Sequence, residues 1–345
     1  MINNKSRYFL LQLRIFLNIF SKGKISFKKI INAAYCFIAY FLKLPRSAKY
    51  PFMINFELWN ECNSNCVFCR TVDGQIYNQN PRSVVPIAKG KMPLEIYEGI
   101  IRQVKDYILM AVLYINGEPL IYPDIFKAIK FASDNKVPTL IATNGILLNE
   151  GNARKLLSSG LDFIKIAVSG FTQGTYKMQH RFGDIEKIKS NLESISKINI
   201  AGNYNCLIVL DYIYYYYNKH ELNLFRSFCK KHGIIFNVRM GNLNGMEDKK
   251  PELSKESNSS VDSNMCDWIW KVLSVDWNGD IFPCCDFVVW GGAKSYATYI
   301  SGSTDLAKVW NSTEAQSFRK IHAKQGKKVL DICARCLRHG TAFKY

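Results

Sequence analysis

The sequence predicts an α/β fold built on a parallel β-sheet that is open or partly closed into a barrel. After Tyr50, short apolar segments rich in β-branched residues alternate with amphipathic segments of helical length. Strands that are covered on both faces read as continuous apolar runs of this kind. Six such repeats imply right-handed crossovers within one sheet.

Each expected element can be placed by its residue range. We expect strands at 52–58, 108–115, 138–143, 163–168, 204–210 and 234–239. We expect helices between them at 93–107, 123–135, 150–159, 184–197 and 219–232. Pro93 suits a first helical turn, and Asp124 and Asn149 are residue types that cap helix N-termini.

Polar motifs follow the expected strands at their carboxyl ends. They are residues 62–69, Asn116-Gly117-Glu118, Thr143-Asn144-Gly145, Ser169 and Arg239, after the first, second, third, fourth and sixth strands. In parallel α/β folds the functional residues gather at this edge of the sheet. The sequence therefore predicts that these motifs converge on one rim.

The β–α period stops after the sixth strand. Residues 247–264 are polar and indicate a linker. Residues 271–287 predict a β-hairpin with Asn278-Gly279 as its turn, followed by an amphipathic helix at 305–324 and a final cysteine pair. We therefore expect a helical extension (1–48), a β–α core (49–245), and a linker with a small, separate, cysteine-bearing domain (246–345).

Two apolar segments, 8–20 and 30–42, flank a basic stretch near the N-terminus. Each is shorter than a membrane span, and neither has a signal-peptide cleavage site. Three interpretations stay open for residues 1–45: peripheral membrane association, packing on the body of the protein, or binding of a protein partner.

The charge and the cysteine content suggest a partner type and a compartment. Lys plus Arg exceed Asp plus Glu by 18, which favours an anionic partner or a solvated basic surface. Only this charge argues for nucleic acid, and we expect none. Seven of the eleven cysteines fall into two clusters, which predicts reduced thiols that bind metal in the cytoplasm, with the inner face of the membrane as an alternative location.

The first cluster is Cys62, Cys66 and Cys69, spaced C-x3-C-x2-C. Three thiolates in one loop can hold three irons of a cubane and leave the fourth iron open to a bidentate ligand. Zinc would need a fourth ligand, and the nearest His in the sequence is His180. With Phe68 before its last cysteine, the motif resembles that of the radical S-adenosylmethionine (SAM) superfamily.

This resemblance implies a partial (β/α)6 TIM-like barrel, a SAM-cleaving [4Fe–4S] cluster, bound SAM, and a flavodoxin- or ferredoxin-type electron donor. The segment Asn116-Gly117-Glu118-Pro119 resembles the family's Gly-Gly-Glu-Pro, which binds the amino group of SAM, although its first Gly is Asn here. Thr143-Asn144 and Ser169 look like the ribose and carboxylate contacts of relatives, and Phe68 would lie near the adenine. A simple turn and core packing are the alternatives for Asn144-Gly145 and Phe68.

The second cluster is Cys266, Cys284, Cys333 and Cys336, spaced C-x17-C-x48-C-x2-C. The hairpin, helix and final Cys-x2-Cys resemble the SPASM/twitch extension, in a single-cluster form similar to that of the butirosin-pathway radical SAM dehydrogenase. Four thiolates would close a second, auxiliary [4Fe–4S] cluster, and structural zinc is the alternative. Cys285 is left over as an alternative ligand, a core thiol, or a hydrogen-atom donor as in radical epimerases.

The resemblance implies an enzyme that reductively cleaves SAM to a 5′-deoxyadenosyl radical and abstracts a substrate hydrogen. The first hypothesis is a dehydrogenase or epimerase acting on a carbohydrate, aminocyclitol or lipid-linked sugar, with Arg239 contacting the substrate hydroxyl unless a salt bridge occupies it. The second is a peptide-modifying enzyme. The third is a non-enzymatic iron–sulfur interaction protein.

Overall fold

The computed structural model describes residues 4–66, 71–72, 75–76, 88–241, 265–290, 294–334 and 336. The strands of its main sheet are β1 (Met53–Phe56), β4 (Met110–Val112), β5 (Thr139–Thr143), β6 (Phe163–Val168), β7 (Leu207–Tyr214), β8 (Ile235–Met240), β9 (Val272–Val275), β10 (Asp280–Phe282) and β11 (Ala297–Thr298). A separate short hairpin joins β2 (Thr71–Val72) to β3 (Gln75–Ile76).

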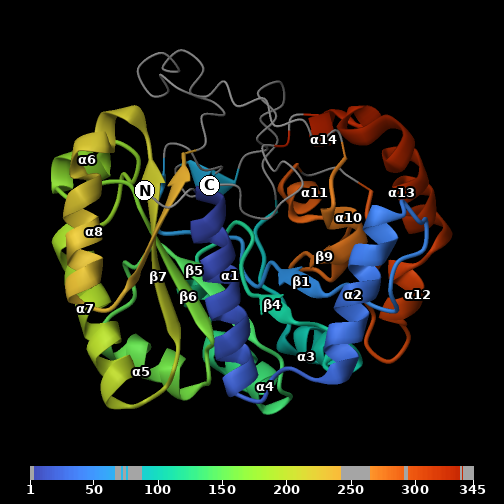
Figure 1. The fold of residues 1–345 in the computed structure, drawn as a ribbon, viewed down its shortest axis with the longest axis horizontal. Coiled ribbons are helices and arrows are strands. Elements are labelled where there is room, and N and C mark those ends of the chain that lie inside the picture. The colour runs from blue at the N-terminus through green and yellow to red at the C-terminus, as the bar shows by residue number, and fades with distance from the viewer. Residues whose placement is uncertain are drawn as a thin grey trace.

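The main sheet confirms the predicted fold class. Its strand order is β11-β10-β9-β1-β4-β5-β6-β7-β8, and β1 and β4 to β8 pair in parallel in the order of the chain (Figure 1). Crossovers that all step in one direction curl a sheet toward a barrel. All six predicted parallel strands are present.

Helices cover the outer face of this sheet. They are α3 (Leu94–Val104), α4 (Ile125–Asp134), α5 (Glu150–Ser158), α6 (Gln173–Lys177), α7 (Ile185–Ala201) and α8 (Leu222–Lys231), with the 3-10 turns η1 (Pro119–Ile121) and η2 (Tyr216–Glu221). Asn149 caps α5 as expected, since its Oδ1 accepts from the backbone N–H of Asn152 at 2.9 Å. Asp124 instead pairs with Lys127 at 2.8 Å and makes no capping bond.

The inner face of the sheet is apolar where the strands begin, and the helix α1 (Asn4–Ser21) covers it there. Ile19 is buried in one cluster with Met110, Val112, Leu140, Phe163 and Val209 of four adjacent strands. Figure 1 shows α1 lying across the strands on the side opposite α7 and α8. Residues 8–20 therefore pack on the body of the protein through one helix face.

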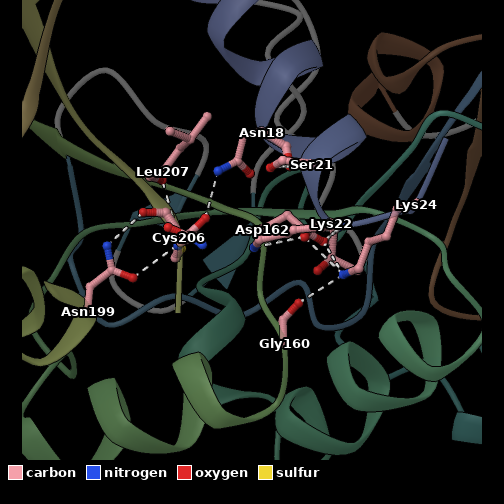
Figure 2. Close-up of polar contacts among 11 residues, drawn as sticks. Asn18, Ser21, Lys22, Lys24, Gly160, Asp162, Asn199, Cys206 and Leu207 are labelled. Carbon is pink, nitrogen blue, oxygen red and sulfur yellow. Dashed lines mark hydrogen bonds and ion pairs between the residues drawn. The ribbon is translucent and has the colours of Figure 1, made fainter. Parts of the chain in front are cut away.

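Buried lysines anchor the turn that joins α1 to α2 (Phe27–Phe41). The Lys24 ammonium donates to both carboxylate oxygens of Asp162, at 2.9 and 2.7 Å, and Lys22 donates to the same carboxylate at 3.1 Å (Figure 2). Asp162 directly precedes β6 and also accepts from the backbone N–H of Thr139. Burial lowers the pKa of Lys29 to about 8, and its ammonium donates to the carbonyls of Lys24 and Lys136.

The C-terminal segment continues the main sheet, so hydrogen bonds between strands join the predicted small domain to the core. β9 pairs in parallel with β1, with Met53 opposite Val272, and the β9–β10 hairpin turns at Gly279 (φ 89°) as predicted. The remaining elements are α10 (Trp268–Lys271), α11 (Cys285–Trp290), α12 (Leu306–Trp310), α13 (Thr313–Gln325), η4 (Gly326–Val329) and α14 (Asp331–Ala334).

Two further expectations for this segment have different outcomes. The single helix predicted at 305–324 is wrong, because α12 ends with Asn311 as its C-cap. The Ser312 hydroxyl then caps a new helix, α13, by accepting from Ala315 N at 3.2 Å. The predicted linker at 247–264 lies outside the described residues. None of the helices described is long and apolar enough to cross a bilayer.

Asp162 offers a direct test of how the N-terminal helices are held. Replacing it by Asn keeps its volume but leaves the buried Lys24 ammonium without a countercharge, which typically costs ~3–5 kcal/mol. We expect Asp162→Asn to lower the thermal unfolding midpoint clearly. The matched control is Asp134→Asn, which breaks an exposed pair with Lys130 worth about 0.5 kcal/mol. Equal midpoints for the two variants would contradict the anchoring.

Candidate active site

The loop that follows β1 carries the first two cysteines of the predicted cluster. Cys66 is buried, and its sulfur lies 3.1 Å from the Ser64 hydroxyl. The Asn144 amide donates to Asn63 at 2.7 Å and lies 3.7 Å from the sulfur of Cys62. The structure thus brings the first and third strand-end motifs together. Phe68 and Cys69 lie outside the described residues.

The second strand-end motif approaches the same loop through its backbone. Gly117 N donates to the Glu57 carboxylate at 3.2 Å, and Glu118 N donates to the carbonyl of Glu61 at 2.8 Å. A Cβ atom on Gly117 would fall 1.7 Å from the carbonyl oxygen of Trp59. Only glycine allows this approach, so Gly117 sets the position of the chain that leads into Cys62.

Glu118 ties the second and third strand ends to each other. Its buried carboxyl accepts from the Thr143 hydroxyl at 2.7 Å and from the backbone N–H groups of Asn144 and Leu120 at 2.8 and 3.0 Å. Burial raises the pKa of Glu118 to about 7, and these hydrogen bonds oppose the rise. Asn116 is half-buried beside it, and Pro119 begins η1. Contact between Glu118 and the SAM ammonium remains a prediction.

Ser169 belongs to a scaffold that supports Cys66. Its hydroxyl bonds to Nδ1 of His180 at 2.7 Å, and its carbonyl accepts from Asn218 at 2.8 Å. His180 forms a backbone bridge with Cys66 and stacks on Tyr176 at 4.6 Å. Burial lowers the pKa of His180 to about 3, so the ring is neutral. His180 is far from Cys66 in the sequence but lies beside the cysteine loop in the fold.

A charged layer lies on the inner face of the sheet, beyond the apolar cluster under α1. Arg239 donates through Nε to Asp211 at 2.6 Å, Asn237 donates to its other oxygen at 2.7 Å, and the Lys165 ammonium lies 3.5 Å away. Burial would raise the pKa of Asp211, but the charges of Lys165 and Arg239 and the hydrogen bonds from Asn237 and Arg239 hold it below its ordinary value. Two cations against one carboxylate leave this layer net positive.

Sequence reasoning found Arg239 but missed Lys165 and Asp211. The available signal was a charged residue within an otherwise apolar strand, as in FIKIAV and LIVLDYIY. Arg239 does form the salt bridge that was the alternative to substrate contact, but only through its Nε. About a third of its side chain (36%) remains exposed. Asp211 therefore orients the guanidinium, whose terminal nitrogens can still serve a ligand.

The four cysteines of the second cluster line one cavity. Cys266, Cys284, Cys333 and Cys336 share it with Asp286, His322 and Lys327. Burial raises the pKa of Cys266 to about 11 and that of Cys333 to about 12. It also raises the pKa of Cys284 well above its ordinary value, with Asp286 adding to the effect. These thiols would ionise only against a bound cation, so the donor set fits an iron–sulfur cluster or zinc.

Cys285 does not line this cavity. It is buried (3% exposed) and packs with Trp268 and Val272. Its neighbour Cys284 is the cysteine that reaches the cavity, because successive residues at the start of α11 point in different directions. The packing matches the core-thiol interpretation of Cys285 more closely than the ligand interpretation.

Comparison with known proteins identifies the family. A model described as the radical SAM superfamily matches residues 56–222, and one described as the SPASM iron–sulfur cluster-binding domain matches residues 266–337. The chain therefore contains a radical SAM domain followed by a SPASM domain. Its cofactors are therefore [4Fe–4S] clusters and SAM, as the cysteine motifs predicted.

Solved structures of radical SAM proteins share this fold. BtrN, in complex with AdoMet and 2-DOIA, has a TM-score of 0.54 at 16% identity, covering 85% of this chain and 96% of BtrN. SuiB of Streptococcus suis, bound to S-adenosylmethionine, has a TM-score of 0.58 at 15% identity, covering 79% of this chain and 68% of SuiB. At these identities the likeness shows the fold alone.

Curated relatives match a part of their length. The AdoMet-dependent heme synthase of Methanosarcina barkeri is 24% identical over 159 residues, which are 46% of this chain and 43% of that protein. A probable GTP 3′,8-cyclase of Methanocaldococcus jannaschii is 23% identical over 186 residues, which are 54% of this chain and 57% of that protein. The chain thus spans about half the length of these relatives.

The two cysteine sites lead us to expect a specific iron content. We expect anaerobic reconstitution to load about eight irons per chain, from two four-iron clusters, and the double change Cys333→Ala with Cys336→Ala to reduce this to about four. Cys206→Ala is the control, because this thiol is buried in the core away from both sites. Four irons in the unaltered protein, or one zinc in the cavity, would show the assignment to be wrong.

Proposed function

We propose that this protein is a radical SAM dehydrogenase that oxidises a small polar molecule, such as a carbohydrate, an aminocyclitol or a lipid-linked sugar. One observation carries the proposal: the charged Lys165–Asp211–Arg239 layer lies on the sheet whose strand ends bear the first cysteine loop, and the four-cysteine cavity adjoins the far edge of that sheet. A flavodoxin- or ferredoxin-type protein would supply the reducing electron.

The residues of the chain divide between holding cofactors and holding substrate. Cys62, Cys66 and Cys69 would hold the first cluster, and the four cavity cysteines the second. With SAM bound, the first cluster would supply the 5′-deoxyadenosyl radical needed to abstract hydrogen from a substrate carbon. The hydrogen bonds from Thr143 and Asn144 to the Glu118 carboxyl would hold the strand-end loops in place around the first cluster.

Arg239 is our proposed contact for the substrate. Asp211 holds its Nε, so the guanidinium keeps one orientation and presents its remaining N–H groups as donors. Such a fork binds a hydroxyl, a carboxylate or a phosphate, and Lys165 adds a second positive charge near it. The lowered pKa of Asp211 makes it a poor proton acceptor, which favours a positioning role.

Oxidation is a better match to the site than epimerisation. An epimerase needs a hydrogen-atom donor facing the substrate, and Cys285 is the proposed one. Its packing between Trp268 and Val272 favours a core thiol instead. A second cluster beside the sheet would accept the electron that an oxidation releases.

Peptide modification is the second candidate function. SuiB has also been solved bound to its precursor peptide SuiA, with a TM-score of 0.56 at 17% identity to this chain. Proteins of this fold therefore accommodate peptides as well as small molecules. A non-enzymatic role is the third candidate, and the following assay separates it from the first two.

SAM cleavage tests the proposal. With dithionite and SAM, we expect the reconstituted protein to release 5′-deoxyadenosine, and the triple change of Cys62, Cys66 and Cys69 to Ala to abolish the release. Arg239→Ala should still release it, because this residue serves the substrate and not SAM. Release that persists in the triple variant, or its absence from the unaltered protein, would overturn the proposal.

A further inference from the structure

The outward faces of α1 and α2 form an unusually apolar surface. Of the 22 exposed large hydrophobic residues described, 14 lie between residues 10 and 44. The most exposed are Phe27 at 76%, Phe41 at 71%, Leu42 at 65% and Phe20 at 60%. Folded proteins rarely expose so many large hydrophobic side chains in one region unless that region binds a partner.

Each helix has two apolar stripes, and only one faces the protein. On α1, Leu11, Ile15 and Ile19 pack on the sheet, while the opposite stripe of Leu10, Leu13, Leu17 and Phe20 is exposed. On α2, Ala33, Cys36 and Ala39 are buried, while Phe27, Ile31, Ile38 and Phe41 are exposed. Figure 1 draws both helices on the side of the molecule that faces the viewer. We call these exposed stripes the outer face of the two helices, which is distinct from the outer face of the sheet.

The charges of this segment are divided in the same way. Residues 1–49 contain ten basic residues and no Asp or Glu: Lys5, Arg7, Arg14, Lys22, Lys24, Lys28, Lys29, Lys43, Arg46 and Lys49. Lys22, Lys24 and Lys29 point inward and anchor the helices. Arg14, Lys28, Lys43 and Arg46 are exposed, so the apolar outer face is flanked by cations.

We propose that the outer face of α1 and α2 docks the enzyme on an anionic lipid bilayer. Apolar side chains flanked by Lys and Arg are suited to the boundary between headgroups and acyl chains. Burial of the apolar side chains and attraction of the cations to anionic headgroups both lower the free energy there. The helices lie on the bilayer, because neither is long and apolar enough to cross it. A second copy of the chain fits less well, because a symmetric contact would bring the two sets of cations together.

The docking surface is preformed. The inward stripes and the Lys24–Asp162 pair hold both helices on the protein, so binding needs no refolding of the segment. Deleting residues 1–45 would therefore expose the sheet beneath α1 and could not isolate the docking role. Point changes on the outer face leave the buried stripes intact.

The test is sedimentation of the reconstituted full-length protein with lipid vesicles. We expect binding to vesicles of equal parts phosphatidylcholine and phosphatidylglycerol, weaker binding to phosphatidylcholine alone, and a loss of binding as salt screens the charges. The double changes Leu17→Ser with Phe20→Ser, and Phe41→Ser with Leu42→Ser, should each weaken binding more than about tenfold.

Two further variants make the test specific. Reversing charge with Arg14→Glu and Lys28→Glu should weaken binding to anionic vesicles by more than about tenfold and leave binding to neutral ones unchanged. Ile200→Ser with Leu224→Ser, exposed residues of α7 and α8, is the control and should bind normally. Circular dichroism and SAM cleavage confirm that each variant is folded.

Three results would overturn the proposal. They are no binding to anionic vesicles, equal binding by the outer-face variants and the control, and a dimer in light scattering that the apolar changes convert to monomers without any vesicle binding. The last result would assign the outer face to a second copy of the chain. Vesicle binding is measured without turnover, so its outcome is independent of the proposed function.

Discussion

The position of β1 in the sheet is the constraint on which both candidate metal sites depend. β1 pairs in parallel with β4 on one side and with β9 on the other. The loop that leaves β1 carries Cys62 and Cys66, and the hairpin that begins with β9 leads into Cys284. Hydrogen bonding along four residues of β1 therefore fixes the two sites relative to each other. A domain joined only by a flexible linker could not hold them at a constant separation.

Above β1, close backbone contacts determine how the second and third strand ends, the predicted SAM-binding segments, meet the cysteine loop. The approach of Gly117 to Trp59 leaves no room for a side chain, and the Glu118 carboxyl then reaches the third strand end. These contacts involve backbone groups and buried hydrogen bonds within the chain, which can hold the strand ends in place. Rigid placement of the groups around a reacting centre reduces the entropy that must be lost in the transition state.

The two faces of the sheet perform different tasks. Helices bury the outer face, which supplies most of the hydrophobic core. On the inner face, α1 covers the apolar beginnings of the strands, and the charged layer around Asp211 follows. Asp162 and Asp211 each form ion pairs with two cationic side chains, Asp162 at the base of the sheet and Asp211 within it. One paired carboxylate anchors the N-terminal helices, and the other orients the proposed substrate contact.

Local patterns in the sequence were sufficient to predict the six parallel strands, the longer outer helices and the hairpin at Gly279. Pairings between distant segments were not predictable in this way. The alignment of β9 beside β1 depends on which strand edge is left open, which no short window contains. Lys165 and Asp211 meet because β6 and β7 pair in a particular register. The sequence alone could not show which side of α1 packs on the sheet, because the helix has two opposite apolar stripes and only one of them is buried.

The most direct test of the central claim is electron paramagnetic resonance of the reduced, reconstituted protein with and without SAM. We predict two [4Fe–4S]⁺ signals, of which SAM changes one. In the variant with Cys333→Ala and Cys336→Ala, the signal that remains should be the one that SAM changes. A spectrum that SAM leaves unaltered in both proteins would contradict the assignment of the first cysteine loop as the SAM-binding cluster.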